Sequence, residues 1–314
     1  MASILDAPQF SDEQAAYDWV EARVWPEGPI CPHCGSVERI SKMQGKSTRI
    51  GTYKCYACRK PFTVKVGTVF ESSHIPLRIW LQAMYLLTSS KKGFSSNQLH
   101  RTLGVTLKSA WFLSHRIREA MRVIGFTPMG GEGAVVEADE TYFGKADKPQ
   151  VSKRRQKDGR PYLKGGRTGP AGKRAVLALV ERGGSVRSFH VEQVDKATVS
   201  RIVQANVRME STLHTDESRL YSGSADHFAA HESVKHSAGE YVRGTVHTNT
   251  IEGVFSIFKR GMKGIYQHCD EKHLHRYLAE YDFRYNNRVA LGVDDVSRAD
   301  RLVKGVVGKR LTYR

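Results

Sequence analysis

Two aspartates of this sequence stand where apolar segments end. Asp139 closes the run Ala-Val-Val-Glu-Ala-Asp, and Asp216 directly follows the segment 211–215. Carboxylates at the ends of adjacent strands can converge on one point, as the ligands of Mg²⁺ ions must. An aspartate at the end of a strand is also a common turn residue, so the pattern alone leaves both roles open.

A third polar group lies in the segment His247-Thr-Asn-Thr-Ile-Glu252. Asn249 and Glu252 are three residues apart, so on a helix they share a face, with Lys259 two turns further along. The same two residues also fit a capping box, in which Asn249 would cap the helix. The segment is therefore predicted to supply either a third metal ligand or a helix cap.

Four of the five cysteines fall into a metal-binding pattern. Cys31 and Cys34 form one CxxC pair, and Cys55 and Cys58 form a second pair twenty residues later. Four thiolates close a tetrahedral zinc site with no open position, which makes such a site structural. Two disulfides are the alternative, and the absence of a secretion signal argues against them. Cys269 is left over and is expected to be a free thiol.

The chain of 314 residues is strongly basic, with 49 Lys and Arg against 32 Asp and Glu and a net charge of +17. Such a charge favours a polyanionic partner, and nucleic acid is the first candidate. Hydrophobic residues make up 40%, which permits a packed core. The longest apolar run, around residues 79–87, is too short to span a bilayer. The sequence thus argues against a membrane protein and against a disulfide-stabilised scaffold.

Residues 95–123 have the pattern of two helices joined by a tight turn at Gly104. The expected N-caps of these helices are Ser95 and Thr106. This helix-turn-helix pattern predicts that Lys108 and Arg116, on the second helix, face a DNA groove or its phosphates. An ordinary helical pair inside a core is the alternative.

Residues 145–174 hold eleven Lys or Arg against two Asp, together with five Gly and three Pro. This composition predicts a flexible basic loop. Within it, Lys153, Arg154 and Arg155 are candidates for contacts with DNA phosphates. Outside it, Arg243, Lys259 and Arg260 are further candidates.

The elements after residue 134 follow the order strand, strand, strand, helix, strand, helix, which indicates a mixed sheet with helices. The expected strands are 134–140, 175–180, 186–191 and 211–215, and the expected helices are 196–207, 250–259 and 271–285. The expected domains are residues 1–70 with a short helix and the zinc ribbon, 71–128 with the helix-turn-helix-like region, 129–300 with the catalytic domain, and 301–314 as a tail.

With these residues in view, the chain resembles an insertion-sequence DDE transposase with an N-terminal zinc ribbon, a bacterial relative of the Merlin transposons. The resemblance extends over roughly residues 25–312. The matching stretches are CPHCG with CYAC, GTVFESSHIPLRIW, VVEADETYFG, LHTDESRLY, HSAGEYVRGTVHTNTIEGVFSIFKRGMKGIY and HLHRYLAEYDFRYNNR. One departure follows Gly144, where the family usually has a second Gly and this chain has Lys145.

The resemblance implies an α+β or α/β chain in which a zinc ribbon and a helical region precede an RNase-H-like mixed-sheet domain. In that fold the first Asp ends the first strand, the second ends the fourth strand, and the third ligand opens a late helix. Matched to this sequence, the ligands of two Mg²⁺ (or Mn²⁺) ions would be Asp139, Asp216 and either Asn249 or Glu252. The spacing of 36 residues from Asp216 favours Glu252.

The function implied is transposition, in which the enzyme binds terminal inverted repeats, hydrolyses a phosphodiester and transfers the strand to target DNA. The expected partners are these two DNAs and further copies of the chain in a synaptic complex. The expected location is the cytoplasm, in association with the nucleoid. Two alternatives remain at this point: a non-catalytic DNA-binding regulator and a metal-dependent nuclease that does not join strands.

Overall fold

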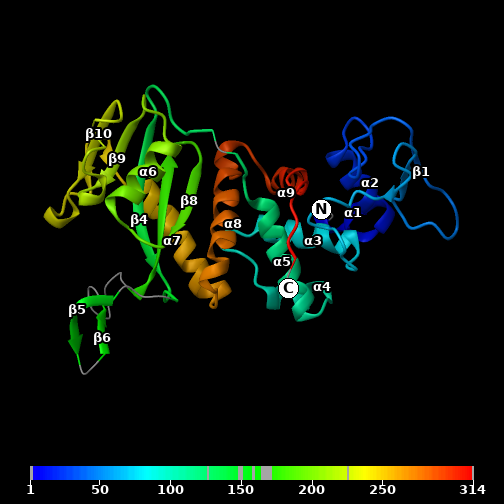
Figure 1. Ribbon diagram of the computed structural model, residues 1–314, viewed down its shortest axis with the longest axis horizontal. Helices are drawn as coiled ribbons and strands as arrows, with labels where there is room; N and C mark the ends of the chain where they lie inside the picture. The colour runs from blue at the N-terminus through cyan, green and yellow to red at the C-terminus, as the bar shows by residue number, and fades with distance from the viewer. Residues whose placement is uncertain are drawn as a thin grey trace. The chain divides into compact units, whose positions relative to one another are not determined.

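The computed structural model describes residues 3–125, 127–147, 151–157, 160–163, 172–224 and 226–312 (Figure 1). Of the segments 151–157 and 160–163 it describes the backbone alone. The chain forms two compact units, of which the first combines residues 1–122 with 287–314 and the second is residues 123–286. In the described residues, no helix is both long and apolar enough to cross a membrane.

The first unit contains a small three-stranded ribbon and a group of helices. Its strands are β1 (Ile40–Lys42), β2 (Tyr53–Cys55) and β3 (Pro61–Phe62), paired antiparallel in that order. Its α-helices are α1 (Pro8–Ser11), α2 (Glu13–Val24), α3 (Leu77–Ser89), α4 (Ser96–Leu103), α5 (Leu107–Met121) and α9 (Asp295–Lys304). The helix α3 is the most apolar of them, and Leu77, Trp80 and Leu87 on it have no exposed surface.

The predicted helix pair is present in α4 and α5, and its local sequence explains its boundaries. Ser95 accepts a hydrogen bond from the backbone N–H of Gln98, and the Gln98 side chain bonds back, which completes a capping box. Gly104 ends α4 in the left-handed region, at φ 65°, which glycine adopts without a Cβ clash. Thr106 then caps α5 by accepting from the N–H of Ser109.

The C-terminal segment was expected to be a tail after a catalytic domain ending at residue 300. The structure instead assigns residues 287–314 to the first unit and forms α9 within them. Arg298 of α9 donates to the carbonyl of Thr88 at the end of α3, at 3.1 Å. Val306 accepts a backbone hydrogen bond from Val69. These bonds link segments more than 200 residues apart, so no local pattern could reveal them.

The second unit is built on a five-stranded mixed sheet. Its strands are β4 (Val135–Phe143), β7 (Arg174–Glu181), β8 (Val186–Val191), β9 (Thr212–Asp216) and β10 (Ala230–Val234). Their order is β10-β9-β4-β7-β8. β4, β7 and β8 pair antiparallel, whereas β9 is parallel to both β4 and β10. This order and orientation are those of an RNase-H-like sheet, which confirms the predicted fold and adds the strand β10 to it.

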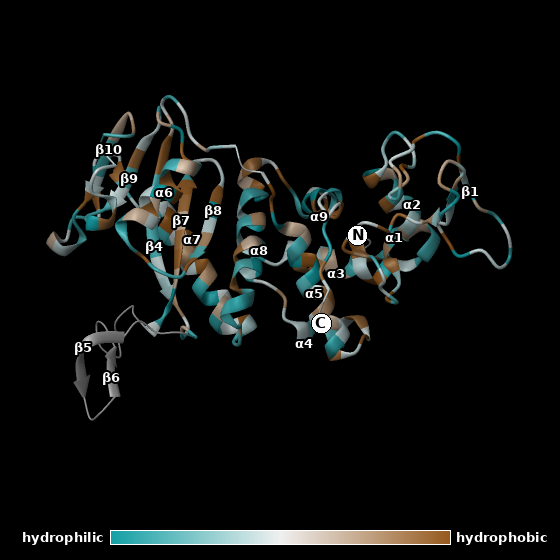
Figure 2. Cartoon of the chain, viewed as in Figure 1, coloured by the Kyte–Doolittle hydropathy of each residue, from teal (hydrophilic) through white to brown (hydrophobic). Residues whose placement is uncertain are grey.

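Helices cover both faces of the sheet. The helix α6 (Lys196–Asn206) packs on one face, where Val199 and Val203 contact side chains of β4 and β7. The helices α7 (Asn249–Gly261) and α8 (Leu274–Asn286) pack on the other face. β7 is apolar along nearly its whole length because it is buried on both sides (Figure 2).

The basic segment 145–174 was expected to be a loop, and the structure corrects this expectation. It contains a hairpin of β5 (Val151–Lys157) and β6 (Arg160–Leu163), paired antiparallel. A second small hairpin, β11 (Val242–Arg243) with β12 (Val246–His247), precedes α7.

Candidate active site and zinc site

Asp139 lies within β4, opposite Ala178 of β7, and the strand continues to Phe143 instead of ending at the acidic residues. Alternate residues of a strand point to opposite faces. Val136 and Ala138 pack in the cluster with α6. Asp139 therefore points to the face that carries α7 and α8. Its neighbour Glu140 points the other way and accepts a hydrogen bond from the Tyr221 hydroxyl at 2.8 Å.

Asp216 is the last residue of β9. β9 runs parallel to β4, with His214 opposite Glu137. Two residues further along each strand, Asp216 and Asp139 therefore lie at neighbouring positions on the same face. The Oδ1 atom of Asp216 accepts from the backbone N–H of Ser218 at 2.9 Å, which orients the carboxylate at the strand end.

Glu252 lies in the first turn of α7, and its side chain is 47% exposed. Its carboxylate accepts from the Thr248 hydroxyl at 3.4 Å and lies 4.0 Å from Nδ1 of His236. The N-cap of α7 is Thr248, which makes no side-chain capping bond, and Asn249 is already helical. The capping box considered from the sequence is therefore not formed. Asn249 is exposed, and its backbone N–H donates to His247.

The electrostatics of Asp139 tie the three carboxylates together. Burial raises the pKa of Asp139 to about 8, and the negative charges of Glu140, Asp216 and Glu252 add to that rise. Such mutual repulsion of oxygen donors is what a bound divalent cation relieves. The carboxylates are close enough to interact, but in the described residues only the four cysteines bring three or more ligand atoms within 4.8 Å of one another.

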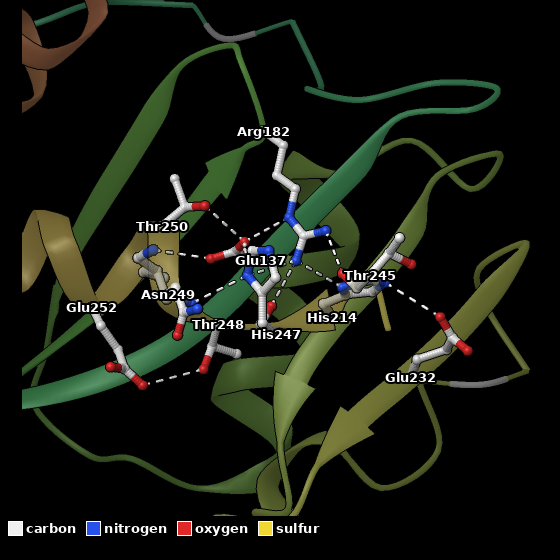
Figure 3. Close-up of polar contacts among 11 residues, drawn as sticks. Glu137, Arg182, His214, Glu232, Thr245, His247, Thr248, Asn249, Thr250 and Glu252 are labelled. Atoms are coloured by element: carbon white, nitrogen blue, oxygen red, sulfur yellow. Dashed lines mark hydrogen bonds and ion pairs between the residues drawn. The ribbon is translucent and has the colours of Figure 1, made fainter. Parts of the chain in front are cut away.

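A buried polar network, which the sequence did not reveal, lies near Glu252 (Figure 3) and includes residues of β4 and β9, the strands that carry Asp139 and Asp216. Its centre is Glu137, whose side chain has no exposed surface and bonds to Arg182 at 2.7 Å. Arg182 also contacts His214 and His247. Burial, followed by the charge of Arg182, lowers the pKa of His214, which keeps this ring neutral at pH 7. The sequence indicated this network only by Glu137, a charged residue inside the otherwise apolar run Ala134–Ala138.

The four predicted zinc ligands converge in the first unit. All four Sγ atoms lie within 4.8 Å of one another, and the pairs Cys31–Cys58 and Cys34–Cys55 are each 3.7 Å apart. Thiolates at the corners of a tetrahedron about 2.3 Å from a central zinc ion lie roughly 3.8 Å apart, whereas a disulfide requires about 2.05 Å. The geometry fits a structural zinc ion and excludes the disulfide alternative.

The predicted DNA-contacting residues have different surroundings. Lys108, Arg243 and Arg260 are exposed, and Lys259 is half-buried on α7. Arg243 lies 3.7 Å from Glu240. Lys153, Arg154 and Arg155 belong to β5, and their side chains lie outside the described part of the chain.

Arg116 corrects the prediction made for it. The side chain is buried, with 2% of the residue exposed, and its guanidinium donates to the carbonyls of Glu71 and Leu311. A guanidinium held in this way cannot reach a DNA phosphate. Helical periodicity placed Arg116 near Lys108, but the residues that bind its side chain lie 45 and 195 positions away in the sequence.

Cys269 forms no disulfide, as expected, and packs half-buried against the cluster that includes α7 and α8.

Two family models match the chain. One, described as the ISXO2-like transposase domain of the IS1595 type, matches residues 130–286, and one described as the transposase zinc-ribbon domain matches residues 11–61. The first range is half of the chain and contains the whole mixed sheet with α7 and α8. The second contains all four cysteines of the zinc site.

The chain is also similar to a protein of Halobacterium salinarum described as an uncharacterized protein in transposable element ISH50. The two are 30% identical over 279 residues, which is 88% of this chain and 91% of that protein. The similarity thus extends over both units.

Two solved structures have a low similarity to the chain. A simian T-cell lymphotropic virus intasome in complex with PP2A regulatory subunit B56 gamma gives a TM-score of 0.30 at 14% identity. The match covers 59% of this chain and 63% of that chain, so this chain spans less than two thirds of its length. The Mos1 strand transfer complex gives a TM-score of 0.29 at 13% identity, over 71% of this chain and 73% of that chain. TM-scores this low define no residue correspondence. The family models and the ISH50 relative show that the chain belongs to the ISXO2-like (IS1595) transposase family and is a DNA transposase.

Proposed function

We propose that Asp139, Asp216 and Glu252 hold the divalent metal ions of the transposition reaction. The observation that carries this proposal is the placement of Asp139 and Asp216 at neighbouring positions on one face of the parallel strands β4 and β9, and the charges of Asp216 and of Glu252 on α7 both act on Asp139. Glu252 is preferred over Asn249 because its charge acts on Asp139, whereas Asn249 stands at the exposed start of α7. Carboxylate oxygens are the ligands that Mg²⁺ and Mn²⁺ favour.

The chain's own part in the chemistry follows from this arrangement. Bound ions supply charge stabilisation for the attacking and leaving oxygens and a water of lowered pKa. Asp139 and Asp216, fixed on adjacent strands, and Glu252, in the first turn of α7, would hold these ions. Lys259, two turns after Glu252 on α7, would neutralise a neighbouring phosphate.

Two displacements at phosphorus account for the products. In the first, a water oxygen bonds to phosphorus at the end of the element and the bond to the 3′ oxygen breaks, which frees a 3′-hydroxyl. In the second, this hydroxyl attacks a target phosphodiester and displaces a 3′ oxygen there, so that the strands are joined. In each step the proton passes from the attacking to the leaving oxygen, and no covalent protein intermediate is required.

The remaining roles follow from charge and fold. The zinc ribbon and the α4–α5 pair would bind the terminal inverted repeats, with Lys108 at a phosphate. Arg243, Arg260 and the strand β5, which carries Lys153, Arg154 and Arg155, would hold DNA near the catalytic face. Joining two ends calls for a homo-oligomeric synaptic complex. An enzyme acting on chromosomal DNA would work at the nucleoid in the cytoplasm.

The test uses purified full-length protein and a labelled duplex carrying the element's own ends, incubated with Mn²⁺ or with EDTA. We expect metal-dependent nicks at the end that are absent in Asp139→Ala and Asp216→Asn, although both variants still bind the duplex. Retained cleavage in either variant would refute the metal assignment. Cleavage without strand-transfer products would identify a nuclease that does not join DNA.

A further inference from the structure

The first turn of α7 is capped from another element. Its N-cap residue, Thr248, provides no side-chain capping bond. Instead, Oε2 of Glu137 on β4 accepts from the backbone N–H of Ile251 at 2.9 Å, and Oε1 accepts from the Thr250 hydroxyl at 2.9 Å. A carboxylate at this place satisfies an otherwise open N–H and interacts favourably with the positive end of the helix.

Arg182 extends this cap toward β9 and the chain that enters α7. Its Nε donates to Glu137 at 2.7 Å. Its Nη1 and Nη2 donate to the carbonyls of Thr245 and His247, at 2.7 and 2.8 Å. Its Nη2 also lies 3.1 Å from Nδ1 of His214, whose Nε2 faces Glu232 at 3.4 Å.

The network therefore has one member on each element that carries a proposed metal ligand, and Figure 3 labels Glu137 of β4, His214 of β9 and Thr250 of α7 among them. Glu137 is two residues before Asp139 on β4, and His214 is two residues before Asp216 on β9, so each pair shares a face of the sheet. Ile251 directly precedes Glu252 on α7. The three elements that supply the ligands come from sequence positions far apart, and Glu137 with Arg182 bonds them to one another.

We propose that Glu137, held by Arg182, is a positioning residue that fixes the first turn of α7 so that Glu252 faces Asp139 and Asp216. The proposal rests on the metal site proposed above. The Glu252 side chain is itself half-exposed, and its two contacts are long, 3.4 Å to the Thr248 hydroxyl and 4.0 Å to Nδ1 of His236, so they hold it only weakly in place. The buried carboxylate of Glu137 fixes the position of Glu252, because it accepts a hydrogen bond from the backbone of the same helical turn.

The test separates reach from charge. Glu137→Asp keeps the negative charge but shortens the side chain by a methylene, so the bond to the Ile251 N–H is lost. We expect faster hydrogen–deuterium exchange in the peptide covering residues 249–256. We also expect Mn²⁺ affinity, measured by titration calorimetry on the zinc-loaded full chain, to fall about tenfold or more, the range typical of partners of metal ligands.

A milder pair of variants keeps the test decisive if Glu137→Asp folds poorly. Thr250→Val removes only the hydroxyl that donates to Glu137, and we expect faster exchange of the same peptide with an affinity loss of a few-fold. Thr250→Ser restores the hydroxyl and is expected to restore both values. A general loss of stability would not be reversed by so small a change.

The matched control is Glu280→Gln. Glu280 is also a fully buried carboxylate of the second unit, but it lies on α8 and is paired with Arg284 one turn along the same helix. This variant is expected to lower the melting temperature without changing Mn²⁺ affinity or exchange of residues 249–256.

The outcomes distinguish the two proposals. Wild-type Mn²⁺ affinity in Glu137→Asp and Thr250→Val, or unchanged exchange of the 249–256 peptide, would overturn the positioning role and leave the metal site in place. Mn²⁺ binding that is the same in the wild type and in Asp139→Ala would overturn the metal site, and the positioning role with it.

Discussion

The guanidinium of Arg116 in α5 donates from Nη1 to the backbone carbonyl of Glu71 at 2.8 Å. The same group donates from Nε to the carbonyl of Leu311 at 3.1 Å, so one side chain links α5 to the segment before α3 and to the C-terminal segment. Lys108, at the start of α5, is therefore the exposed one of the two predicted DNA-contacting residues, whereas Arg116 lies in the interior of the first unit.

Arg116→Ala is expected to destabilise the protein and to leave the salt dependence of DNA binding unchanged. The substitution takes the donor from the carbonyls of Glu71 and Leu311, which are half-buried, so the cost for each stays below the about 1–3 kcal/mol of a fully buried unsatisfied group. Chemical denaturation measures the stability, and duplex binding at several salt concentrations measures the slope.

Lys108→Ala is the contrasting variant. We expect it to leave stability unchanged and to reduce the slope of log binding constant against log salt concentration by about 1, as for the loss of one phosphate contact. A smaller slope in Arg116→Ala at unchanged stability would show that Arg116 does meet DNA.

Replacing the third ligand candidates separately tests their assignment. Glu252→Gln should lower end cleavage by about 100-fold or more, since even the partners of metal ligands contribute 10–100-fold. Asn249→Ala should have a small effect, because Asn249 is exposed at the start of α7 and its backbone N–H, which bonds His247, is retained. Single-turnover cleavage of labelled ends measures both rates, with duplex binding as the control. The opposite ranking would assign the ligand to Asn249.

Asp282 gives the second unit a stability that depends on pH. Its carboxylate accepts from the backbone N–H and the hydroxyl of Ser188, and burial raises its pKa from 3.8 to about 7. Because the folded state holds this proton more tightly than the unfolded state, the contribution to stability falls as pH rises from about 4 to about 7 and is constant above that range.

Asp282→Asn removes the titration while its amide still bonds Ser188. The variant should therefore gain stability over the wild type across the same pH window. Melting temperatures of both proteins between pH 4 and 8 measure this gain, and parallel curves would show that Asp282 does not titrate there.

Removing zinc should unfold the ribbon. Its strands have only two or three residues each, and its apolar cluster is centred on Cys31, Cys55 and Phe62, so little besides the metal holds it together. We expect a strong chelator, or Cys55→Ser, to release the zinc and abolish binding of the terminal repeats. Zinc release measured with a colorimetric indicator, and hydrogen exchange of residues 31–62, check this. Unchanged exchange after complete zinc loss would contradict it.

Features written in short stretches of sequence could be predicted, and features assembled from distant segments could not. The cysteine spacing identified the ribbon, and Ser95, Gly104 and Thr106 marked the helix pair, because caps and turns act over a few residues. The strand β10 has one fully buried residue, Val234, so its apolar pattern was too weak to indicate a strand.

The site shows the same limit. Asp139 and Asp216 were proposed from the strands that carry them, and their roles as ligands remain predictions. Glu137 was missed because its partners Arg182 and Thr250 come from β-hairpin and helix segments 45 and 113 residues away. Burial of a charge becomes informative only when the groups that compensate it are known.

Because residues 287–314 belong to the first unit, the sequence of the second unit is inserted into that of the first. During synthesis, the second unit is complete in sequence when residue 286 has emerged, whereas the first still lacks α9 and the partners of Arg116 and Thr88. The second unit, with its proposed metal ligands, is therefore complete in sequence before the first unit, which is proposed to bind the ends of the element. Any chain cut short before residue 287 would carry the proposed metal ligands without a completed first unit. Under the proposed division of roles, truncation would remove recognition of the ends and leave the metal site.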